Sequence, residues 1–376
     1  MKRASANPGL QAGDKRALRV YKLRLRDKHA TELNRQARAV NIVWNYVNET
    51  QQKAAKSLRR WLGYSDLARL TAGAGQELDL HSHTVQRVCA EYDKSRRQQR
   101  KPWLRWRGRK SLGWVPFNTG HVTFDGIAFT FRGTRYQTMH LRDMPTGAAI
   151  RAGSFNSDSR GRWYVNVTVE VEIAAEASAL PAVGVDLGLK TLATLSSGEK
   201  IEAPRLYRAS EIQLATSQRA RKTKRTRAIH AKVANRRKDF LHKASDRITK
   251  NFGLIVIGDV SPSKMTSSRM AKSTLDAGWA SFKAMLSYKA ITHGGMVLEV
   301  SEVDTTQLCS TCGTKPSSRP KGIAGLGIRD WTCSDCGAAH DRDVNAARNI
   351  LRVGLHALAE GASGSVGGSL RLQAEE

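Results

Sequence analysis

The spacing of hydrophobic residues predicts a mixed N-terminal half, in which strands flank a block of helices. Residues 18–25 alternate between apolar and polar, which is typical of a strand. From Thr31 to about Arg100, apolar residues recur every three or four positions, as on the buried face of a helix. Two further helices, at 64–70 and 82–92, are separated by a loop at Gly73 and Gly75. Short alternating runs between turns then predict strands at 121–124, 128–132, 137–141, 149–154 and 163–171.

The second half predicts a sheet with helices between its strands. Residues 182–190 form an alternating strand, and 191–203 continue it as a hairpin that turns at Ser197 and Gly198. A long helical segment follows, from Ser210 to about Asn251. The apolar run 254–260 indicates a strand buried on both faces, and a helix at 275–292 leads to a strand at 296–303. A strand–helix–strand order makes the two strands parallel neighbours, so their C-terminal ends lie together.

These elements predict a multidomain α/β protein with a boundary at 174–181, where the chain is rich in Ala, Glu and Ser and ends in Pro. The first strand and the later short strands are expected to form one small β-barrel, interrupted by the helices. The expected parts are a disordered leader (1–16), a β-barrel (17–27 and 105–175), a helical domain (28–104), a second α/β domain (182–308 and 337–355), a metal knuckle (309–336) and a disordered tail (356–376).

The charge of the chain narrows the kinds of partner. The 62 Lys and Arg residues against 33 Asp and Glu give a net charge of +29. A field of this size attracts polyanions and predicts extensive contact with phosphates. No basic amphipathic helix with a clean apolar face suggests a membrane surface, and the apolar run 254–257 is far too short to span a bilayer. The N-terminus has no apolar core of a secretory signal.

Two segments concentrate this positive charge. Residues 96–110 hold eight basic residues, no acidic one, and Trp103 and Trp106; residues 219–238 hold ten Lys or Arg and no acid. Basic groups neutralise phosphates and aromatic faces stack on bases, although a solvated linker with both tryptophans packed on the barrel is the alternative. The residues expected to contact nucleic acid are Arg97, Arg100, Lys101, Arg105, Arg107, Arg221, Lys222, Lys224, Arg225, Arg236 and Arg237.

Four of the five cysteines form the pattern C-x2-C-x20-C-x2-C, with a glycine after each pair. Cys309, Cys312, Cys333 and Cys336 are therefore expected to bind Zn²⁺ as four thiolates. A redox dithiol pair or an iron–sulfur cluster is the alternative. With no open ligand position, such a zinc ion is structural rather than catalytic. Cys89 lies in a helical stretch and is expected to be a small buried apolar residue.

Two aspartates are placed for metal-dependent phosphodiester cleavage. Asp186 lies among glycines on the strand 182–190, and Asp343 opens the last helix, directly after the knuckle. Hydrolysis with two Mg²⁺ ions requires carboxylates from separate elements that converge on one pocket. The alternative for Asp343 is a helix N-cap.

The motifs VDLGLKTLATLSSGE, TTQLCSTCG…CSDCG and HDRDVNAARNIL resemble those of the TnpB proteins encoded by transposons. The resemblance is strong over 182–352 and weaker, in layout only, over 18–173. It implies a RuvC-like nuclease of RNase H fold, a helical recognition domain and an oligonucleotide-binding barrel. It also implies a guide RNA from the element's own end and a double-stranded DNA target beside a short motif. Asp186 is then the first catalytic carboxylate and Asp343 the third.

The chain departs from the family at the second carboxylate, because Gly258 stands where a glutamate is usual. Asp259 is adjacent, but one step along a strand turns a side chain to the opposite face. Glu302 ends the neighbouring parallel strand, about 5 Å away, and Gly258 leaves room for a carboxylate that reaches across. We therefore expect Asp186, Glu302 and Asp343 to be the catalytic residues and the magnesium ligands.

The predicted function is an RNA-guided DNA endonuclease that cleaves beside a short motif by two-metal-ion hydrolysis. The alternative is a nuclease-dead protein that binds DNA under RNA guidance and represses transcription. A transposase that acts without RNA is less favoured, since no Tyr or His-x-His arrangement is placed for strand transfer. The expected location is the bacterial cytoplasm, in association with the nucleoid, and nothing in the sequence indicates an oligomeric state.

Overall fold

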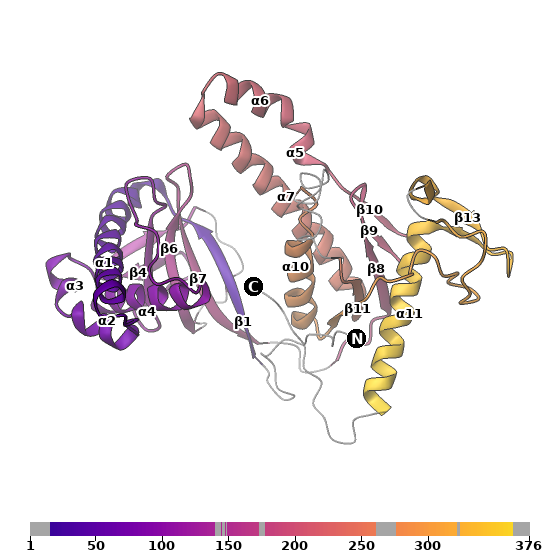
Figure 1. The fold of residues 1–376 in the computed structure, drawn as a ribbon, viewed down its shortest axis with the longest axis horizontal. Helices are drawn as coiled ribbons and strands as arrows, with labels where there is room; N and C mark the ends of the chain where they lie inside the picture. The colour runs from indigo at the N-terminus through magenta and orange to yellow at the C-terminus, as the bar shows by residue number, and fades with distance from the viewer. Residues whose placement is uncertain are drawn as a thin grey trace. The chain divides into compact units, whose positions relative to one another are not determined.

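The computed structural model describes residues 16–139, 144, 147, 149–172, 177–260, 276–321 and 324–363. The chain divides into two compact units, one of residues Leu18–Val171 and one formed mainly by Glu172–Glu376 (Figure 1). Apart from Arg16, the predicted leader 1–16 lies outside the described residues. Among the residues described, no helix is both long and apolar enough to cross a membrane.

The first unit contains two antiparallel sheets. The larger has the order β1-β7-β6-β2 and the smaller has the order β3-β4-β5, and a bridge between Leu25 and Thr138 joins them. Their buried faces share one core, which includes Phe117, Phe155 and Trp163. The strands are β1 (Arg16–Arg24), β2 (Trp114–Asn118), β3 (Val122–Phe124), β4 (Ala128–Phe131), β5 (Thr134–Gln137), β6 (Ile150–Ser157) and β7 (Trp163–Glu172).

Two strands of this unit differ from the sequence-based expectation. The strand β2 was not predicted as a separate element. The last strand of the small sheet was expected at 137–141 but begins at Thr134, because Arg132 and Gly133 both adopt positive φ and turn the chain tightly there. The end of the expected strand, 140–141, lies outside the described residues.

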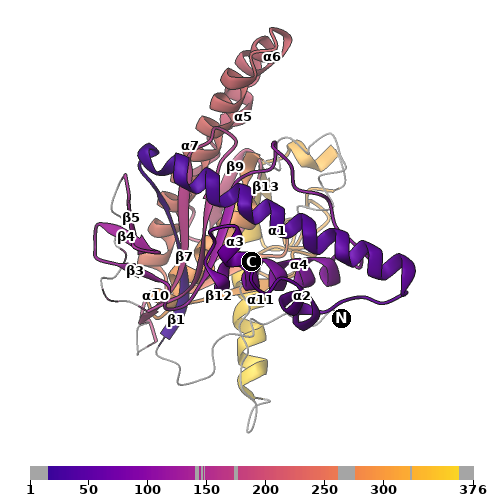
Figure 2. The ribbon, with the colours of Figure 1, turned by 90° about the vertical axis from the view of Figure 1, so that its left-hand side faces the viewer.

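Helices cover the larger sheet of this unit. The long helix α1 buries Leu33, Val40 and Val47 along one face, and Figure 2 shows its full length. A buried cluster joins it to α4. The loop expected at Gly73 and Gly75 contains a short helix of its own. The helical elements are η1 (Asp27–His29), α1 (Ala30–Ser57), α2 (Tyr64–Leu70), α3 (Ala74–Glu77) and α4 (Ser82–Gln98).

The second unit is built on a five-stranded sheet of order β10-β9-β8-β11-β12. In this unit β9 pairs antiparallel with both of its neighbours, β8 and β10. The hairpin between β9 and β10 turns at Gly198, as predicted. The strand β11 runs parallel to β12, as predicted, and also parallel to β8. The strands are β8 (Ala182–Leu187), β9 (Thr191–Leu195), β10 (Lys200–Glu202), β11 (Leu254–Gly258) and β12 (Met296–Val300).

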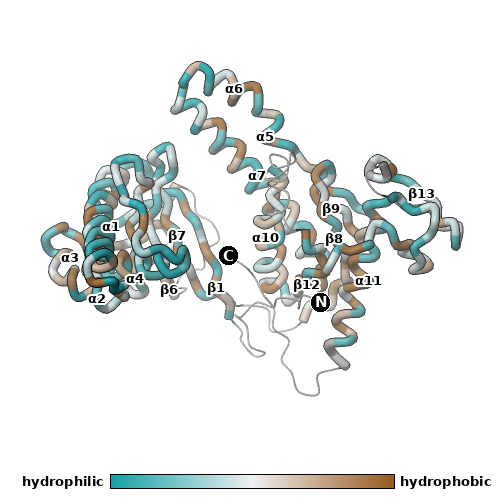
Figure 3. The backbone as a smooth tube through the Cα atoms, in the orientation of Figure 1, coloured by the Kyte–Doolittle hydropathy of each residue, from teal (hydrophilic) through white to brown (hydrophobic). Residues whose placement is uncertain are grey.

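Helices cover both faces of this sheet (Figures 1 and 3). Val183 and Val185 of β8 point into a core with α7 (Thr223–Asn251) and α10 (Trp279–Thr292). Side chains alternate along a strand, so Gly184 and Asp186 point to the opposite face, which α11 (Arg342–Ser363) covers. This alternation separates a hydrophobic face from the face that carries the aspartate.

The long helical segment expected from Ser210 to Asn251 is wrong as a single helix. The structure forms a short helix α5 (Leu206–Ala209) and then a hairpin of α6 (Glu211–Arg219) and α7. Arg221 adopts a positive φ at the turn, where the hydroxyls of Ser217 and Thr226 are hydrogen-bonded at 2.8 Å. The basic segment 219–238 therefore spans the tip of a hairpin and the first half of α7.

The predicted disordered tail, 356–376, is also partly wrong, because α11 continues to Ser363. Strong helix formers follow one another after Leu351 without a proline, and His356 pairs with Glu360 one turn later at 3.4 Å. Before α11, the knuckle contributes a short helix and a small sheet: η2 (Ala324–Gly327), β13 (Asp330–Thr332) and β14 (Ala339–Asp341).

The fit of α11 to the sheet gives a first prediction. A methyl group added at Gly184 would overlap the carbonyl oxygen of Ala347 and lie 2.8 Å from Cβ of Leu351. We expect Gly184→Ala to destabilise the chain by about 1–3 kcal/mol, because the helix must move outward. Thermal unfolding measures this cost. The matched control is Gly327→Ala, where a methyl group meets nothing within 4 Å, and equal unfolding midpoints in both variants would contradict the close packing.

Candidate functional site

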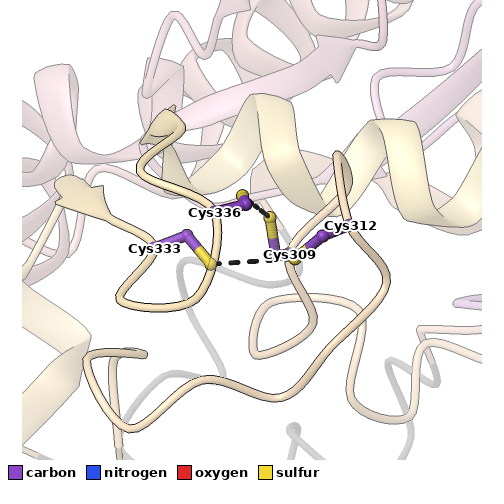
Figure 4. A group of neighbouring side chains, drawn as sticks. All are labelled: Cys309, Cys312, Cys333 and Cys336. Atoms are coloured by element: carbon purple, nitrogen blue, oxygen red, sulfur yellow. Dashed lines mark hydrogen bonds between the residues drawn. The ribbon is translucent and has the colours of Figure 1, made fainter.

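The four cysteines of the two C-x2-C pairs meet in the structure (Figure 4). Their sulfur atoms all lie within 4.8 Å of one another. The Sγ atoms of Cys309 and Cys336 are 3.7 Å apart, and those of Cys312 and Cys333 are 3.8 Å apart. A glycine after each pair takes a positive φ, which allows each turn to present two sulfurs to the same point. This cluster could bind zinc, and within the described parts of the chain it is the only such convergence of ligand atoms.

The three predicted carboxylates come from three different elements and influence one another. Burial raises the pKa of Asp186 well above its usual value, and the charges of Glu302 and Asp343 raise it further. Arg342 and Arg329 oppose this effect only in part. The charges of two carboxylates from outside β8 therefore oppose the ionisation of Asp186.

Glu302 lies two residues beyond the end of β12, and its side chain occupies the space above Gly258. A Cβ atom built on Gly258 would collide with the Glu302 carboxyl group. The register explains why. Gly258 pairs with Val300 of β12, and Glu302 shares the face of Val300 because side chains alternate. Any side chain at position 258 would therefore displace the carboxylate of Glu302.

The carboxyl group of Glu302 is held without a hydrogen-bonding partner on one oxygen. Its Oε1 atom is buried, and no donor within the described part of the chain reaches it. Burial raises the pKa of Glu302 to about 7, against the positive charge of Lys283, while Asp259 and Glu299 add to the rise. A buried acceptor with no donor beside two other carboxylates is suited to a cation with oxygen ligands.

Asp259 has a different position. Its side chain is exposed, and its Oδ1 accepts a hydrogen bond from the backbone N–H of Glu302 at 3.4 Å. The backbone N–H of Asp259 in turn donates to the carbonyl oxygen of Val300 at 2.8 Å. Asp259 therefore supports the backbone on which Glu302 stands, and its carboxylate does not fill the space above Gly258.

The N-cap proposed as the alternative role of Asp343 is filled by Asp341. Oδ1 of Asp341 accepts hydrogen bonds from the backbone N–H groups of Asp343 and Val344, at 3.1 and 2.9 Å. Asp343 instead extends from the first turn of α11. Both of its oxygens accept hydrogen bonds from Arg329, each at 2.8 Å. The carboxylate of Asp343 is therefore not consumed by capping the helix.

Most of the predicted nucleic-acid residues are exposed, but two are only partly exposed and already have partners within the chain. Arg107 lies between the rings of Trp44 and Trp114, each 5.7 Å away, and burial lowers its pKa. Arg237 pairs at 2.7 Å with Asp276, which is only 6% exposed. The exposed residues are Arg97, Arg100, Lys101, Arg105, Arg221, Lys222, Lys224, Arg225 and Arg236.

The basic segment after α4 is fastened to α1 by side chains that the sequence analysis did not identify. Asn48 donates to the carbonyl of Leu104 and accepts from its N–H, and Asn45 does the same with Arg107. Of the two tryptophans, Trp106 is exposed, whereas Trp103 is half-buried beneath Lys56. Asn45 and Asn48 lie one turn apart on the same face of α1, and this spacing could have indicated that the face binds another segment of backbone.

The residues around the carboxylates were also missed. Arg329 bonds to the carboxylate of Asp343, Asp341 bonds to the backbone N–H of Asp343, and the charge of Lys283 lowers the pKa of Glu302. None of the three lies in the same helix or strand as the group on which it acts. Only Asp341 left a signal in the sequence, because an aspartate two residues before Asp343 is suited to cap the same helix.

Comparison with known proteins places the chain among the nucleases and transposases of mobile elements. The profile of the Cas12f1-like TNB domain matches residues 279–350, and that of the OrfB_IS605 family, described as a probable transposase, matches 164–269. A Streptomyces pristinaespiralis protein named as an RNA-guided DNA endonuclease is 31% identical over 383 residues, covering 92% of this chain and 91% of its own. The chain belongs to this family, the TnpB family, as the sequence motifs predicted.

Two further matches are less extensive. The Escherichia coli K12 protein InsQ, also named as an RNA-guided DNA endonuclease, is 32% identical over 235 residues, which is 54% of this chain and 57% of InsQ. A solved structure of a Cas12f1–sgRNA–target DNA complex covers 89% of this chain and 99% of that one. Its TM-score is 0.37 and its identity is 14%, a likeness too distant to carry an argument.

The raised pKa of Glu302 predicts how the magnesium-free protein responds to pH. The pKa of Glu302 is about 7 in the folded state, against a usual value of 4.5. An acid whose pKa is higher in the folded state lowers the free energy of unfolding as the pH rises from the lower value to the higher one. Glu302→Gln removes this penalty. We expect the variant to be more stable than wild type by about 1–2 kcal/mol above pH 7, after allowance for solvent, and equal to it near pH 4.

Thermal unfolding across this pH range, without magnesium, measures the difference. The matched control is Glu299→Gln, which removes an exposed carboxylate from β12 that pairs with Lys283. A gain in stability that is the same at low and high pH, or that the control reproduces, would contradict the buried position of Glu302.

Proposed function

We propose that this chain is a transposon-encoded, RNA-guided DNA endonuclease that hydrolyses phosphodiester bonds beside a short DNA motif. Membership of the TnpB family supports the class of activity. The observation that carries the chemistry is the carboxyl group of Glu302 above Gly258, within the electrostatic reach of Asp186. The chain lacks the usual glutamate on β11, yet a carboxylate from the next strand fills the same space.

The second unit supports a RuvC-like nuclease of RNase H fold. Its antiparallel strands β8, β9 and β10 are followed by β11 and β12, which run parallel to β8, and α11 lies across the catalytic face. We propose that the first unit combines an oligonucleotide-binding barrel, 17–27 and 105–175, with a helical recognition domain, 28–104. Its two sheets, one shared core and long helices are consistent with this division.

Asp186, Glu302 and Asp343 would hold Mg²⁺ ions as oxygen ligands. The fit rests on the unpartnered Oε1 of Glu302 and on the mutual repulsion that raises the pKa of Asp186. Bound Mg²⁺ would activate the attacking water and stabilise the leaving oxygen. Asp259 orients Glu302 through the backbone, and Arg329 holds Asp343 from the opposite side. In the reaction the oxygen of water forms a new P–O bond while the P–O bond to the leaving oxygen breaks; the water gives up a proton to solvent, and the leaving oxygen takes one up to become a hydroxyl.

The four cysteines would hold one structural Zn²⁺, with no open position for substrate. His340 adds a contact from outside this set, because its Nε2 lies 3.0 Å from the sulfur of Cys309. Since His340 is followed at once by Asp341 and Arg342, the knuckle is joined directly to the start of α11.

Guide RNA and double-stranded DNA are the proposed partners. The net charge of +29 and the exposed basic residues on α7 and after α4 supply the phosphate contacts that both require. Such a protein would work in association with the bacterial nucleoid. The relatives named as RNA-guided DNA endonucleases support this pair of partners.

Cleavage by the complex provides the central test. The protein is purified with its own RNA, and a plasmid carrying a matched target is incubated with Mg²⁺. We expect Asp186→Ala, Glu302→Ala and Asp343→Ala each to lower the cleavage rate at least about 100-fold, because each removes a proposed metal ligand. Asp259→Ala is the comparison variant: it removes a hydrogen bond to the Glu302 backbone but no proposed metal ligand, so it should lower the rate far less than Glu302→Ala.

The outcomes separate the two functions. Undiminished cleavage by Glu302→Ala would refute the rearranged site. Loss of cleavage in Asp259→Ala with retention in Glu302→Ala would assign the role to Asp259. Tight RNA-dependent binding without cleavage by wild type would favour the repressor.

Elemental analysis tests the zinc site. We expect one zinc ion per chain in the wild type and much less in Cys333→Ala, because three thiolates leave the tetrahedral site incomplete. The loss should also expose the knuckle to proteases, since the buried hydrophobic cluster among its described residues consists of Cys309, Trp331 and Cys333. Cys89→Ala, which changes a buried cysteine outside the cluster, should keep its zinc. A full complement of zinc in Cys333→Ala would rule out four-thiolate coordination.

A further inference from the structure

Two buried asparagines of α11 hold the loop that connects Glu302 to the cysteine knuckle. We propose that Asn345 and Asn349 are positioning residues for cleavage, because they fix Glu302 relative to Asp343. The inference rests on the proposed function, in which Glu302 and Asp343 bind the same metal ions. Both asparagines are 1% exposed, and neither belongs to the carboxylates or the cysteines that the mechanism uses.

Each asparagine bonds to the backbone of the loop 303–308. The Nδ2 group of Asn349 donates to the carbonyl oxygens of Thr305 and Leu308, both at 2.8 Å. The Nδ2 group of Asn345 donates to the same two oxygens, at 3.4 and 2.8 Å. The amide groups of Asn345 and Asn349, one helical turn apart, therefore donate to the same two carbonyl oxygens. No other described side chain donates to either oxygen.

Thr305 connects these hydrogen bonds to Glu302. Thr305 donates to the carbonyl oxygen of Glu302 twice, from its backbone N–H at 3.2 Å and from its hydroxyl at 2.9 Å. Thr305 is 3% exposed, so these bonds are shielded from water. On the other side, Asp259 accepts from the backbone N–H of Glu302. The backbone of Glu302 is thus held between β11 and, through Thr305, α11.

Asn345 also bonds to the knuckle. The Oδ1 atom of Asn345 accepts a hydrogen bond from the backbone N–H of Ser310, inside the first C-x2-C turn, at 2.8 Å. Asn345 lies only two residues after Asp343 on a helix whose neighbouring residues, Ala346 and Ala347, are fully buried. The helix α11 therefore carries Asp343 and, through its asparagines, also sets the position of the loop that follows Glu302.

Asn349→Asp tests the proposal. It keeps the shape of the side chain but replaces the donor with a carboxylate that repels both carbonyls. In the complex with its own RNA, we expect the Mg²⁺ concentration for half-maximal cleavage to rise about tenfold or more, as for residues that orient metal ligands. Target binding measured with Ca²⁺ should be unchanged. A general loss of stability would instead weaken binding and leave the magnesium midpoint in place.

A second readout does not depend on cleavage. Hydrogen exchange of a peptide spanning 303–308 should become faster in Asn349→Asp, while exchange in β8 and β11 should not change. The matched control is Asn251→Asp, which changes an exposed asparagine at the end of α7. If Asn349→Asp does not fold, the milder Asn349→Ser, which shortens the side chain beyond reach, is measured in the same way.

The two readouts distinguish the possible failures. Faster loop exchange with an unchanged magnesium midpoint would overturn the proposal, because the loop would then be held without positioning Glu302. Unchanged exchange would overturn it as well. If the wild-type complex binds its target but does not cleave at any magnesium concentration, the proposed nuclease function is wrong. Hydrogen exchange then decides by itself whether Asn345 and Asn349 hold the loop 303–308.

Discussion

The close approach of α11 to the central sheet is the constraint on which the second unit depends. The helix lies so near β8 and β11 that two positions have no room for a side chain. A methyl group at Gly184 would overlap Ala347, and one at Gly354 would lie 2.5 Å from the side chain of Val256. A helix that packed at the usual distance for larger side chains would carry Asp343 away from Asp186. Backbone contact at these glycines therefore limits how far Asp343, in the first turn of α11, can lie from Asp186 on β8.

That proximity has an electrostatic cost. Asp186 is buried among negative charges, and burial holds the pKa of Glu302 near 7, so the folded state resists full ionisation of the site. The positive charges of Arg329 and Lys283 reduce this penalty only in part. A divalent cation would stabilise the ionised carboxylates far more effectively. Under the proposed function, the site would bind metal at the expense of the stability of the metal-free protein.

The sequence was sufficient to predict the features that depend on local spacing. The alternation of 182–190, the apolar run 254–260 and the two C-x2-C pairs each correspond to an observed strand or cluster. Features that depend on a single backbone torsion were not predictable: the positive φ of Arg221 converts one expected helix into a hairpin. Nor were contacts between distant elements, such as Asn349 with Thr305, because hydrophobic periodicity carries no information about which loop a polar side chain will meet.

The missing glutamate shows how the register of a parallel sheet permits an exchange of residues. Gly258 and Val300 are paired, so the residue at 258 and the residue two beyond Val300 point to the same face. In this chain the Glu302 carboxyl group lies where a side chain on β11 would begin. The two positions compete for a single volume, and a glutamate at 258 would displace Glu302 instead of joining it. A carboxylate just beyond the end of β12 therefore requires a glycine at position 258, and the observed position of Glu302 depends on that glycine.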